Sequence, residues 1–150
     1  MRSIGITQSS YYDPERNEHY EKYDSNWTTL LETLNLQPYP IPNRIISPKL
    51  WIEKANLGGF ILTGGNDLSH LNGAKNSSKE RDNLEFFLIK YSIENNMPLL
   101  GVCRGMQIIN YFFNGNIVRI NNHVAINHKI FLELNGKYLN KIVNSFHNWG

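Results

Sequence analysis

The sequence predicts an α/β fold, a three-layer domain in which helices cover both faces of a mostly parallel sheet. Three observations lead to this prediction. Strand-like and helix-like segments alternate along the 150 residues. The strand-like segments are continuously apolar, as in strands that are buried on both faces. Glycine-rich loops follow two of these segments, and in such sheets ligands bind beyond the carboxyl ends of the strands.

The first third of the chain predicts a strand, a long loop and a helix. Residues 3–7 are short and apolar, as in a buried strand, and the polar residues 8–24 are expected to form a loop over one end of the sheet. Asp24 or Ser25 can cap the helix that follows. The apolar residues of this helix recur every three or four positions: Trp27, Leu30, Leu31 and Leu34.

Prolines shape the next segment. Residues 38–42 contain three prolines and must be extended, because proline removes backbone donors and restricts the residue before it. Ser47 followed by Pro48 is typical of an N-cap with proline in the first helical position. The predicted helix is short and carries Trp51, Ile52 and Ala55.

The remaining elements lead to the two glycine-rich loops. Residues 59–63 predict a buried strand that ends in the loop 64–67, Gly-Gly-Asn-Asp. A longer helix follows the polar segment 69–79, with one apolar stripe formed by Leu84, Phe87, Leu88 and Tyr91. The last predicted strand, at 97–100, runs through residues 101–105 into a helix that reaches Phe113.

Cys103 is the only cysteine, and it lies between Gly101 and Gly105 where a predicted strand meets a predicted helix. Glycines let the chain turn sharply there, which is the form of a nucleophile elbow. The free N–H groups at the beginning of the helix can stabilise an oxyanion. A buried, inert thiol is the commoner role of a lone intracellular cysteine. The flanking glycines favour the nucleophile instead.

Composition and charge exclude several classes of partner. The net charge is +2, and Lys and Arg form no run, so neither nucleic acid nor an anionic membrane is indicated. No apolar stretch reaches membrane-spanning length. A single cysteine forms no internal disulfide, and neither the cysteine nor the pair His123 and His128 has the spacing of a metal site. We therefore expect a cytoplasmic protein that acts on a small molecule and needs no metal or other cofactor.

Four segments, in this order, carry a resemblance to a known family. They are residues 58–67, Glu80-Arg81-Asp82 with Glu85, residues 101–107 with Asn110, and residues 143–150. Together they resemble the class I glutamine amidotransferases, and within them the γ-glutamyl-γ-aminobutyrate hydrolase branch, peptidase C26. His123-Val124-Ala125 and Asn148-Trp149-Gly150 are similar to a smaller bacterial subgroup. That subgroup includes γ-glutamyl-CDP-amidate hydrolases, which serve the phosphoramidate decoration of capsules.

The resemblance implies a flavodoxin-like fold and a role for each matching residue. Cys103 would attack a γ-glutamyl carbonyl and form a glutamyl thioester, which water would cleave to L-glutamate. The backbone N–H groups of Gly65 and Arg104 would form the oxyanion hole. The remaining matches would bind substrate: Gly64, Asn66, Gln107, Phe146, His147, Asn148 and Trp149. For Arg81 and Asp82, at the beginning of a predicted helix, we expect capping in preference to bracing of the active-site loops.

One departure from the family pattern matters. The resemblance implies a catalytic His and Glu in a later His-Pro-Glu motif, and none occurs in these 150 residues. His147 would lie near the substrate and is not expected to be the base. We therefore expect residues 1–150 to be a single amidotransferase-like domain whose C-terminal part, with the His-Pro-Glu motif, is missing.

Three functions stay open at this point. The first is a hydrolase that cleaves a γ-glutamyl amide such as γ-glutamyl-CDP-amidate, and it is favoured by Arg104 directly after the nucleophile. The second is a glutaminase subunit that delivers ammonia to a synthase partner. The third is a non-catalytic module in which Cys103 senses oxidants. No residue reads out the leaving group, and segments 8–24 and 38–46 are the expected specificity elements.

Overall fold

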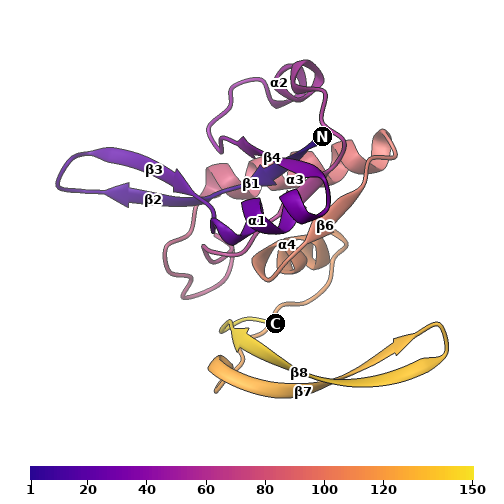
Figure 1. Ribbon diagram of the computed structural model, residues 1–150. Coiled ribbons are helices and arrows are strands. Elements are labelled where there is room, and N and C mark those ends of the chain that lie inside the picture. The colour runs from indigo at the N-terminus through magenta and orange to yellow at the C-terminus, as the bar shows by residue number, and fades with distance from the viewer. The chain divides into compact units, whose positions relative to one another are not determined.

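The computed structural model describes residues 1–150, shown as ribbons in Figure 1. Where the sequence predicts one domain, contacts divide the chain into two compact units, Met1–Gly115 and Asn116–Gly150. Each unit is described by itself. None of the helices combines the length and the apolar character that crossing a membrane requires.

A four-stranded parallel sheet forms the centre of the first unit. Its order is β4-β1-β5-β6, and every neighbouring pair is parallel. The strands are β1 (Arg2–Thr7), β4 (Leu36–Ile41), β5 (Phe60–Leu62) and β6 (Leu99–Gly101). Because the strands run the same way, β1, β5 and β6 all end at one edge. The predicted α/β class and parallel sheet are confirmed.

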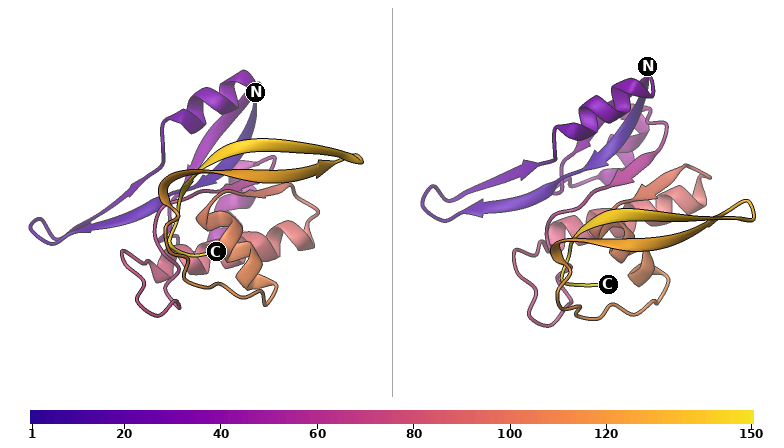
Figure 2. Two further views of the ribbon diagram at one scale, coloured as in Figure 1. Left: turned by 90° about the horizontal axis from the view of Figure 1, so that it is seen from below. Right: turned by 60° about the horizontal axis from the view of Figure 1, so that its bottom comes forward.

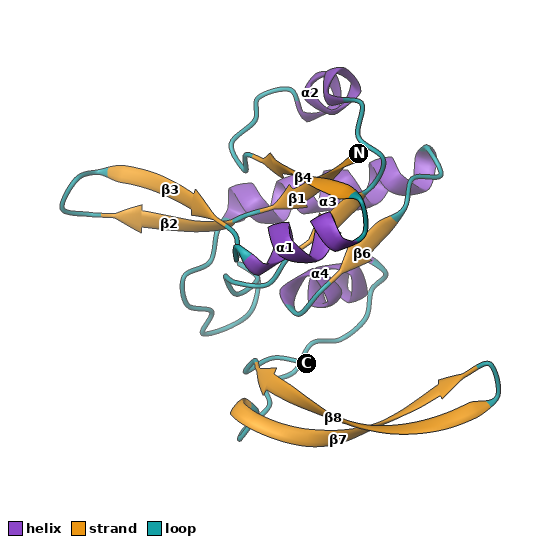
Figure 3. Ribbon diagram, viewed as in Figure 1, coloured by secondary structure: helices purple, strands orange, loops and turns teal.

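Helices cover both faces of this sheet. The four helices are α1 (Asn26–Thr33), α2 (Pro48–Ala55), α3 (Lys79–Glu94) and α4 (Arg104–Phe112). Leu31 of α1 packs with Ile6 and Ile61, whereas the neighbouring Phe60 contacts Tyr91 of α3 with ring centroids 6.3 Å apart. Successive strand residues point to opposite faces, so α1 and α3 lie on opposite sides, as Figure 3 shows. The three-layer prediction is confirmed.

Helix α4 packs against α3. Phe86 of α3 contacts both Tyr111 and Phe112 of α4, with ring centroids 5.9 and 5.8 Å apart. A β-carbon added at Gly105 would collide with the backbone of Leu62, so α4 crosses the end of β5 at the closest distance that glycine permits. This contact fixes the beginning of α4, where Cys103 lies, against the end of β5.

The predicted long loop over residues 8–24 is wrong. This segment forms an antiparallel hairpin of β2 (Ser9–Asp13) and β3 (Glu18–Lys22), which extends from the first unit in Figure 2. Tyr11 pairs with Tyr20 across the hairpin, and their rings stack. Neither face of this ribbon is buried, so the sequence lacks the apolar alternation by which strands are identified.

The apolar face predicted for α1 is correct only in part. Leu31 is buried and Trp27 is half-buried, but Leu30 and Leu34 are 49% and 60% exposed. Leu34 is the residue that ends the helix, and Leu30 faces a cavity described below. The two other predictions for this region are confirmed, because β4 carries its prolines at the sheet edge and Pro48 begins α2 after Ser47.

The second unit consists mainly of a long antiparallel hairpin. Strand β7 (Val124–Leu134) pairs with β8 (Lys137–Phe146) through a two-residue turn. Both turn residues, Asn135 and Gly136, have positive φ values, 51° and 74°, as a type I′ turn requires. The strands themselves were not predicted from the sequence.

Candidate active site

Cys103 lies on the predicted elbow. Strand β6 ends at Gly101 and α4 begins at Arg104, so the chain reverses over two residues. The backbone of Cys103 has φ 55° and ψ −111°, a conformation that residues with a β-carbon rarely adopt. Its carbonyl accepts the N–H groups of Met106 and Gln107 at 3.0 and 3.2 Å, and its side chain is exposed. The thiol is therefore presented to solvent at the beginning of a helix.

The loop after β5 runs directly beside this thiol. A β-carbon added at Gly64 would lie 3.7 Å from Sγ of Cys103. Gly65 has φ 119°, which only glycine adopts readily. Arg104 is the first residue of α4, so its N–H has no carbonyl one turn earlier to bind. These positions agree with an oxyanion hole formed by the N–H groups of Gly65 and Arg104, an assignment that stays a prediction.

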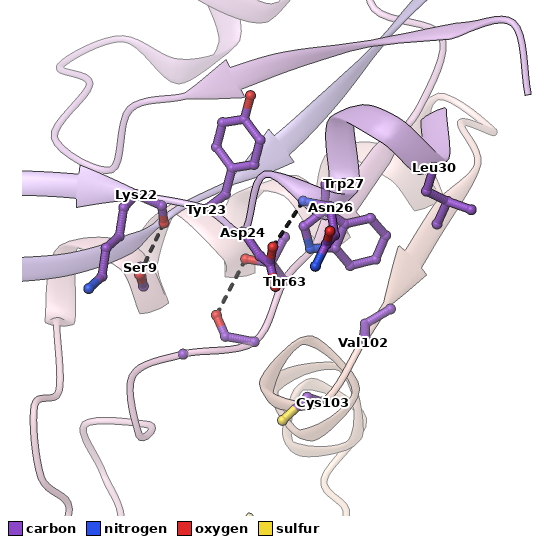
Figure 4. A pocket seen from close by; sticks show the side chains of 12 residues that line it. Ser9, Lys22, Tyr23, Asp24, Asn26, Trp27, Leu30, Thr63, Val102 and Cys103 are labelled. Carbon is purple, nitrogen blue, oxygen red and sulfur yellow. Dashed lines mark hydrogen bonds between the residues drawn. The ribbon is translucent and has the colours of Figure 1, made fainter. Parts of the chain in front are cut away.

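A cavity of about 700 Å³ opens beside Cys103. Figure 4 shows its side chains, which come from the hairpin, from α1 and from the ends of β5 and β6. The lining residues are Ser9, Lys22, Tyr23, Asp24, Asn26, Trp27, Leu30, Thr63, Gly64, Gly65, Val102 and Cys103. All of them belong to the first unit.

Four buried charged side chains lie beneath the two loops. Arg81, Asp82 and Glu85 come from α3, and Arg104 comes from α4. Arg81 Nε donates to Glu85 Oε1 at 2.9 Å, and the Arg104 guanidinium donates to both carboxylates. Two cations thus balance two anions in a site with almost no exposed surface. Such an arrangement is tolerated only when the charges are paired and hydrogen-bonded.

We call these four residues the buried ion network. They also hold the loops after β5 and β6 in place. Arg81 Nη2 donates to the carbonyl of Thr63 at 2.7 Å, directly before Gly64. Thr7, at the end of β1, donates its hydroxyl to Glu85 at 2.8 Å. Burial lowers the pKa of the Arg81 guanidinium, and Glu85 opposes this effect. The expectation that Arg81 and Asp82 only cap α3 is therefore wrong.

Ser78 is the residue that caps α3. The Ser78 hydroxyl accepts the N–H of Arg81 at 3.3 Å, and the Asp82 carboxylate instead accepts the backbone N–H of Ser69 at 2.8 Å. The sequence does contain a signal for the buried network. Arg81 and Glu85 lie on the same helix stripe as Leu84 and Leu88, and charges on a buried stripe indicate buried ion pairs.

Asn66 holds the loops together through its side chain. Its Oδ1 accepts the Ser10 N–H at 2.8 Å and Arg81 Nη1 at 3.2 Å, while its Nδ2 donates to the carbonyls of Ser10 and Asn76. Both ends of the amide are thus occupied by the protein. The structure assigns this side chain a bracing role, and its contact with substrate stays a prediction.

The other predicted substrate residues divide between the two units. Gln107 is buried one turn into α4, in the unit that contains Cys103. Phe146, His147, Asn148 and Trp149 lie in the second unit. There His147 Nδ1 lies 2.8 Å from the carbonyl of Trp149, and the ring of Trp149 is buried beneath the Arg119 guanidinium. Their role toward substrate also stays a prediction.

No group of three His, Cys, Asp or Glu side chains in residues 1–150 is arranged to hold a metal ion. His123, His128 and His147 do approach one another in the second unit. The His123 ring centroid lies 4.9 Å from that of His128 and 5.2 Å from that of His147.

Comparisons with known proteins show the family of this chain. The family model for Peptidase C26 matches residues 3–148. The γ-glutamyl-CDP-amidate hydrolase of Campylobacter jejuni is 34% identical over 97% of this chain and 70% of its own length. A glutamine amidotransferase-like protein of Lactococcus lactis is 42% identical over 39% of this chain and 28% of its own length.

The solved structures support the fold. A Thermoplasma acidophilum protein described as a GMP synthase subunit superposes with a TM-score of 0.65 at 21% identity. The match covers 99% of this chain and 66% of the Thermoplasma chain, so these residues span about two thirds of that structure. Fold, motifs and family match agree: the chain belongs to the Peptidase C26 family of amide hydrolases, within the class I glutamine amidotransferase-like group.

Proposed function

We propose that this protein is a cysteine-dependent γ-glutamyl amide hydrolase and that Cys103 is its nucleophile. The observation that carries the proposal is the exposed thiol on the elbow, beside the Gly64–Gly65 loop and a cavity of about 700 Å³. The family match and the hydrolase that is 34% identical over 97% of the chain support it.

The proposed reaction has two steps. Cys103 Sγ attacks the γ-carbonyl carbon, the C–N bond breaks, and the leaving nitrogen takes a proton while a glutamyl thioester forms. Water then attacks the thioester, which releases L-glutamate and restores the thiol. The N–H groups of Gly65 and Arg104 stabilise the oxyanion in both steps. The resemblance assigns the base to a His-Pro-Glu motif, and no residue described here is given that role.

The substrate we propose is γ-glutamyl-CDP-amidate. The supporting observation is the Campylobacter hydrolase, whose similarity extends over 97% of this chain, whereas the Lactococcus similarity extends over 39%. The product would be a nucleotide amidate, made in the cytoplasm for the phosphoramidate decoration of capsules. The partner in this reaction is a small molecule.

The test is glutamate release by the protein at its native length. It would be offered γ-glutamyl-CDP-amidate, γ-glutamyl-γ-aminobutyrate and glutamine, with Cys103→Ala as the inactive control. We expect fastest turnover of the nucleotide and a loss of about 10³-fold or more in the variant. Turnover that survives in Cys103→Ala would exclude the proposed nucleophile.

A glutaminase subunit is the second candidate. The observation that favours it is the structural similarity to a protein described as part of a GMP synthase. A subunit of this kind would hydrolyse glutamine and would depend on a synthase partner, whereas a hydrolase acts alone. The third candidate, a redox-sensing module with Cys103 as the sensor, would show no turnover of any γ-glutamyl substrate.

A further inference from the structure

The cavity beside Cys103 has two kinds of wall. Thr63, Gly64, Gly65, Val102 and Cys103 form the catalytic wall. The larger part of the lining comes from the hairpin and the beginning of α1, and it includes Lys22, Asp24 and Trp27. We call these three residues the outer wall. Nothing in the two-step reaction requires the outer wall.

The outer wall lies where a leaving group would go. Of the residues of this unit that are expected to bind substrate, Gly64 lines the cavity on the catalytic wall, whereas Asn66 and Gln107 do not line it. A volume of about 700 Å³ also falls in the range of sites for drug-sized ligands, roughly 300–1,000 Å³, and exceeds what a five-carbon glutamyl group fills. The two sides of the scissile bond must diverge from Cys103, so the part of the cavity away from the catalytic wall is available to the leaving group.

Trp27 supplies a fixed, flat surface in this wall. Its half-buried side chain packs against the cluster of Ile6, Leu31 and Ile61, which holds the ring in place. The remainder of the side chain borders the cavity next to Leu30 (Figure 4). An indole ring that is packed against the core and also borders a cavity is suited to stacking on a planar base.

Lys22 supplies a positive charge. It is exposed at the end of β3 and takes part in no ion pair within residues 1–150. Asp24 carries the carboxylate of this wall, and its Oδ1 accepts the N–H of Asn26 at 2.9 Å. The wall is therefore not positive as a whole, and Lys22 is its one group that can pair with a phosphate.

We propose that the outer wall is the leaving-group subsite, in which Trp27 stacks on a planar base and Lys22 pairs with the phosphates of a nucleoside diphosphate amidate. Trp27 and Lys22 therefore determine specificity. This inference rests on the proposed γ-glutamyl hydrolase function and assigns its leaving group to residues of this chain.

The test measures kcat/KM for γ-glutamyl-CDP-amidate and for glutamine, together with CDP binding to the Cys103→Ala protein by calorimetry. In Trp27→Ala we expect kcat/KM for the nucleotide to fall about 10- to 100-fold, with a much smaller fall for glutamine. In Lys22→Met we expect a loss of about tenfold, confined in the same way to the nucleotide. CDP affinity should fall in parallel.

Control variants separate recognition from folding. Trp51→Ala removes an indole that packs on Tyr39 outside the cavity, and Lys49→Met removes an exposed lysine of α2. Both should keep the nucleotide-to-glutamine ratio of the wild type. Lys22 is exposed, so Lys22→Met remains informative even where Trp27→Ala fails to fold.

The two proposals fail separately. The subsite is overturned if the wild type hydrolyses the nucleotide and both outer-wall variants keep its nucleotide-to-glutamine ratio of kcat/KM and its CDP affinity. The proposed hydrolase function then still holds. Absence of γ-glutamyl hydrolysis, with CDP binding that Trp27→Ala and Lys22→Met weaken, would overturn the function and support the subsite. Absence of both hydrolysis and CDP binding overturns both.

Discussion

At Cys103 a strained backbone carries the thiol that we propose as the nucleophile. A residue other than glycine in this region of φ and ψ costs about 1–3 kcal/mol, and such strain persists only where the surroundings impose it. Here Gly105 packs against Leu62 and the buried ion network holds α4. The sequence predicted the sharp strand–helix turn at this residue, because glycines on both sides of one cysteine at such a junction are typical of a nucleophile elbow. That Cys103 is the nucleophile stays a prediction.

The strain at residue 103 leads to a stability prediction. Cys103→Gly should be more stable than Cys103→Ala, with an unfolding free energy about 1 kcal/mol higher, because glycine adopts this backbone conformation without a β-carbon clash. Both variants lack the thiol, so they form a matched pair. Urea unfolding at pH 7 measures the difference, and equal stability would mean that the backbone there is not strained.

Glu80 provides a pH-dependent prediction. Its own backbone N–H in the first turn of α3 is the main cause that lowers the pKa of its carboxyl, and Ser78 and Arg44 add to this effect. Because the pKa of this carboxyl is lower in the folded state, its ionised form stabilises the fold at pH values above the unfolded-state pKa. This stabilisation disappears as pH falls through the folded-state pKa. Because the side chain is 48% exposed, the effect is about 0.3 kcal/mol at pH 7. Glu80→Gln should lose it at pH 7, and the difference in unfolding free energy from the wild type should shrink as pH falls below the unfolded-state pKa, as measured by urea unfolding.

Helices α3 and α4 contact each other through aromatic rings and through buried ion pairs. The apolar stripe and the elbow predicted these helices from sequence. Arg81 and Glu85 share the stripe of Leu84 and Leu88, which signals their burial but does not identify their partners. Arg81, Asp82 and Glu85 look like an ordinary helix N-terminus when only capping rules are applied. Their partners, Thr63 and Arg104, are about 20 residues away in either direction, and such pairings follow from tertiary packing and not from local sequence.

Breaking the buried ion network should lower the unfolding free energy far more than breaking a surface ion pair on the same helix. Glu85→Gln leaves two buried guanidinium groups with too little negative charge, and we expect a loss of about 3–5 kcal/mol of unfolding free energy. Glu94→Gln breaks the exposed pair with Lys90, whose N–O distance is 3.7 Å, and should cost at most about 0.5 kcal/mol. Thermal or urea unfolding of the two variants provides the comparison. A loss below about 1 kcal/mol in Glu85→Gln would mean that the network contributes little to stability.

For the whole molecule, the parallel sheet explains why distant residues meet. β5 and β6 pair in parallel, so the loops at 63–65 and 102–104 leave the same edge, and Gly64 borders Cys103. That convergence was predictable from continuously apolar strands followed by glycine-rich loops. The hairpin at 9–22 was not, because its residues are polar on both faces and the cavity that they line exists only in three dimensions.

This architecture predicts an uneven distribution of local stability. The buried residues of β1 and β5 should exchange their amide hydrogens only on global unfolding, whereas the exposed ribbon of β2 and β3 should open locally. Hydrogen exchange followed by mass spectrometry measures both. Protection of residues 9–22 equal to that of residues 2–7 would show that the ribbon is part of the cooperative core.

Arg104 has a consequence for how such an enzyme can diversify. Its N–H is assigned to the oxyanion, and every residue except proline supplies that group, whereas its guanidinium binds two buried carboxylates. Replacing the side chain would therefore keep the assigned N–H and lose the contacts that hold the beginning of α4. Lys22, on the β2–β3 ribbon, is exposed and takes part in no ion pair. Substitutions that change the leaving group should therefore be tolerated more readily on the ribbon than at Arg104, with the reacting groups kept.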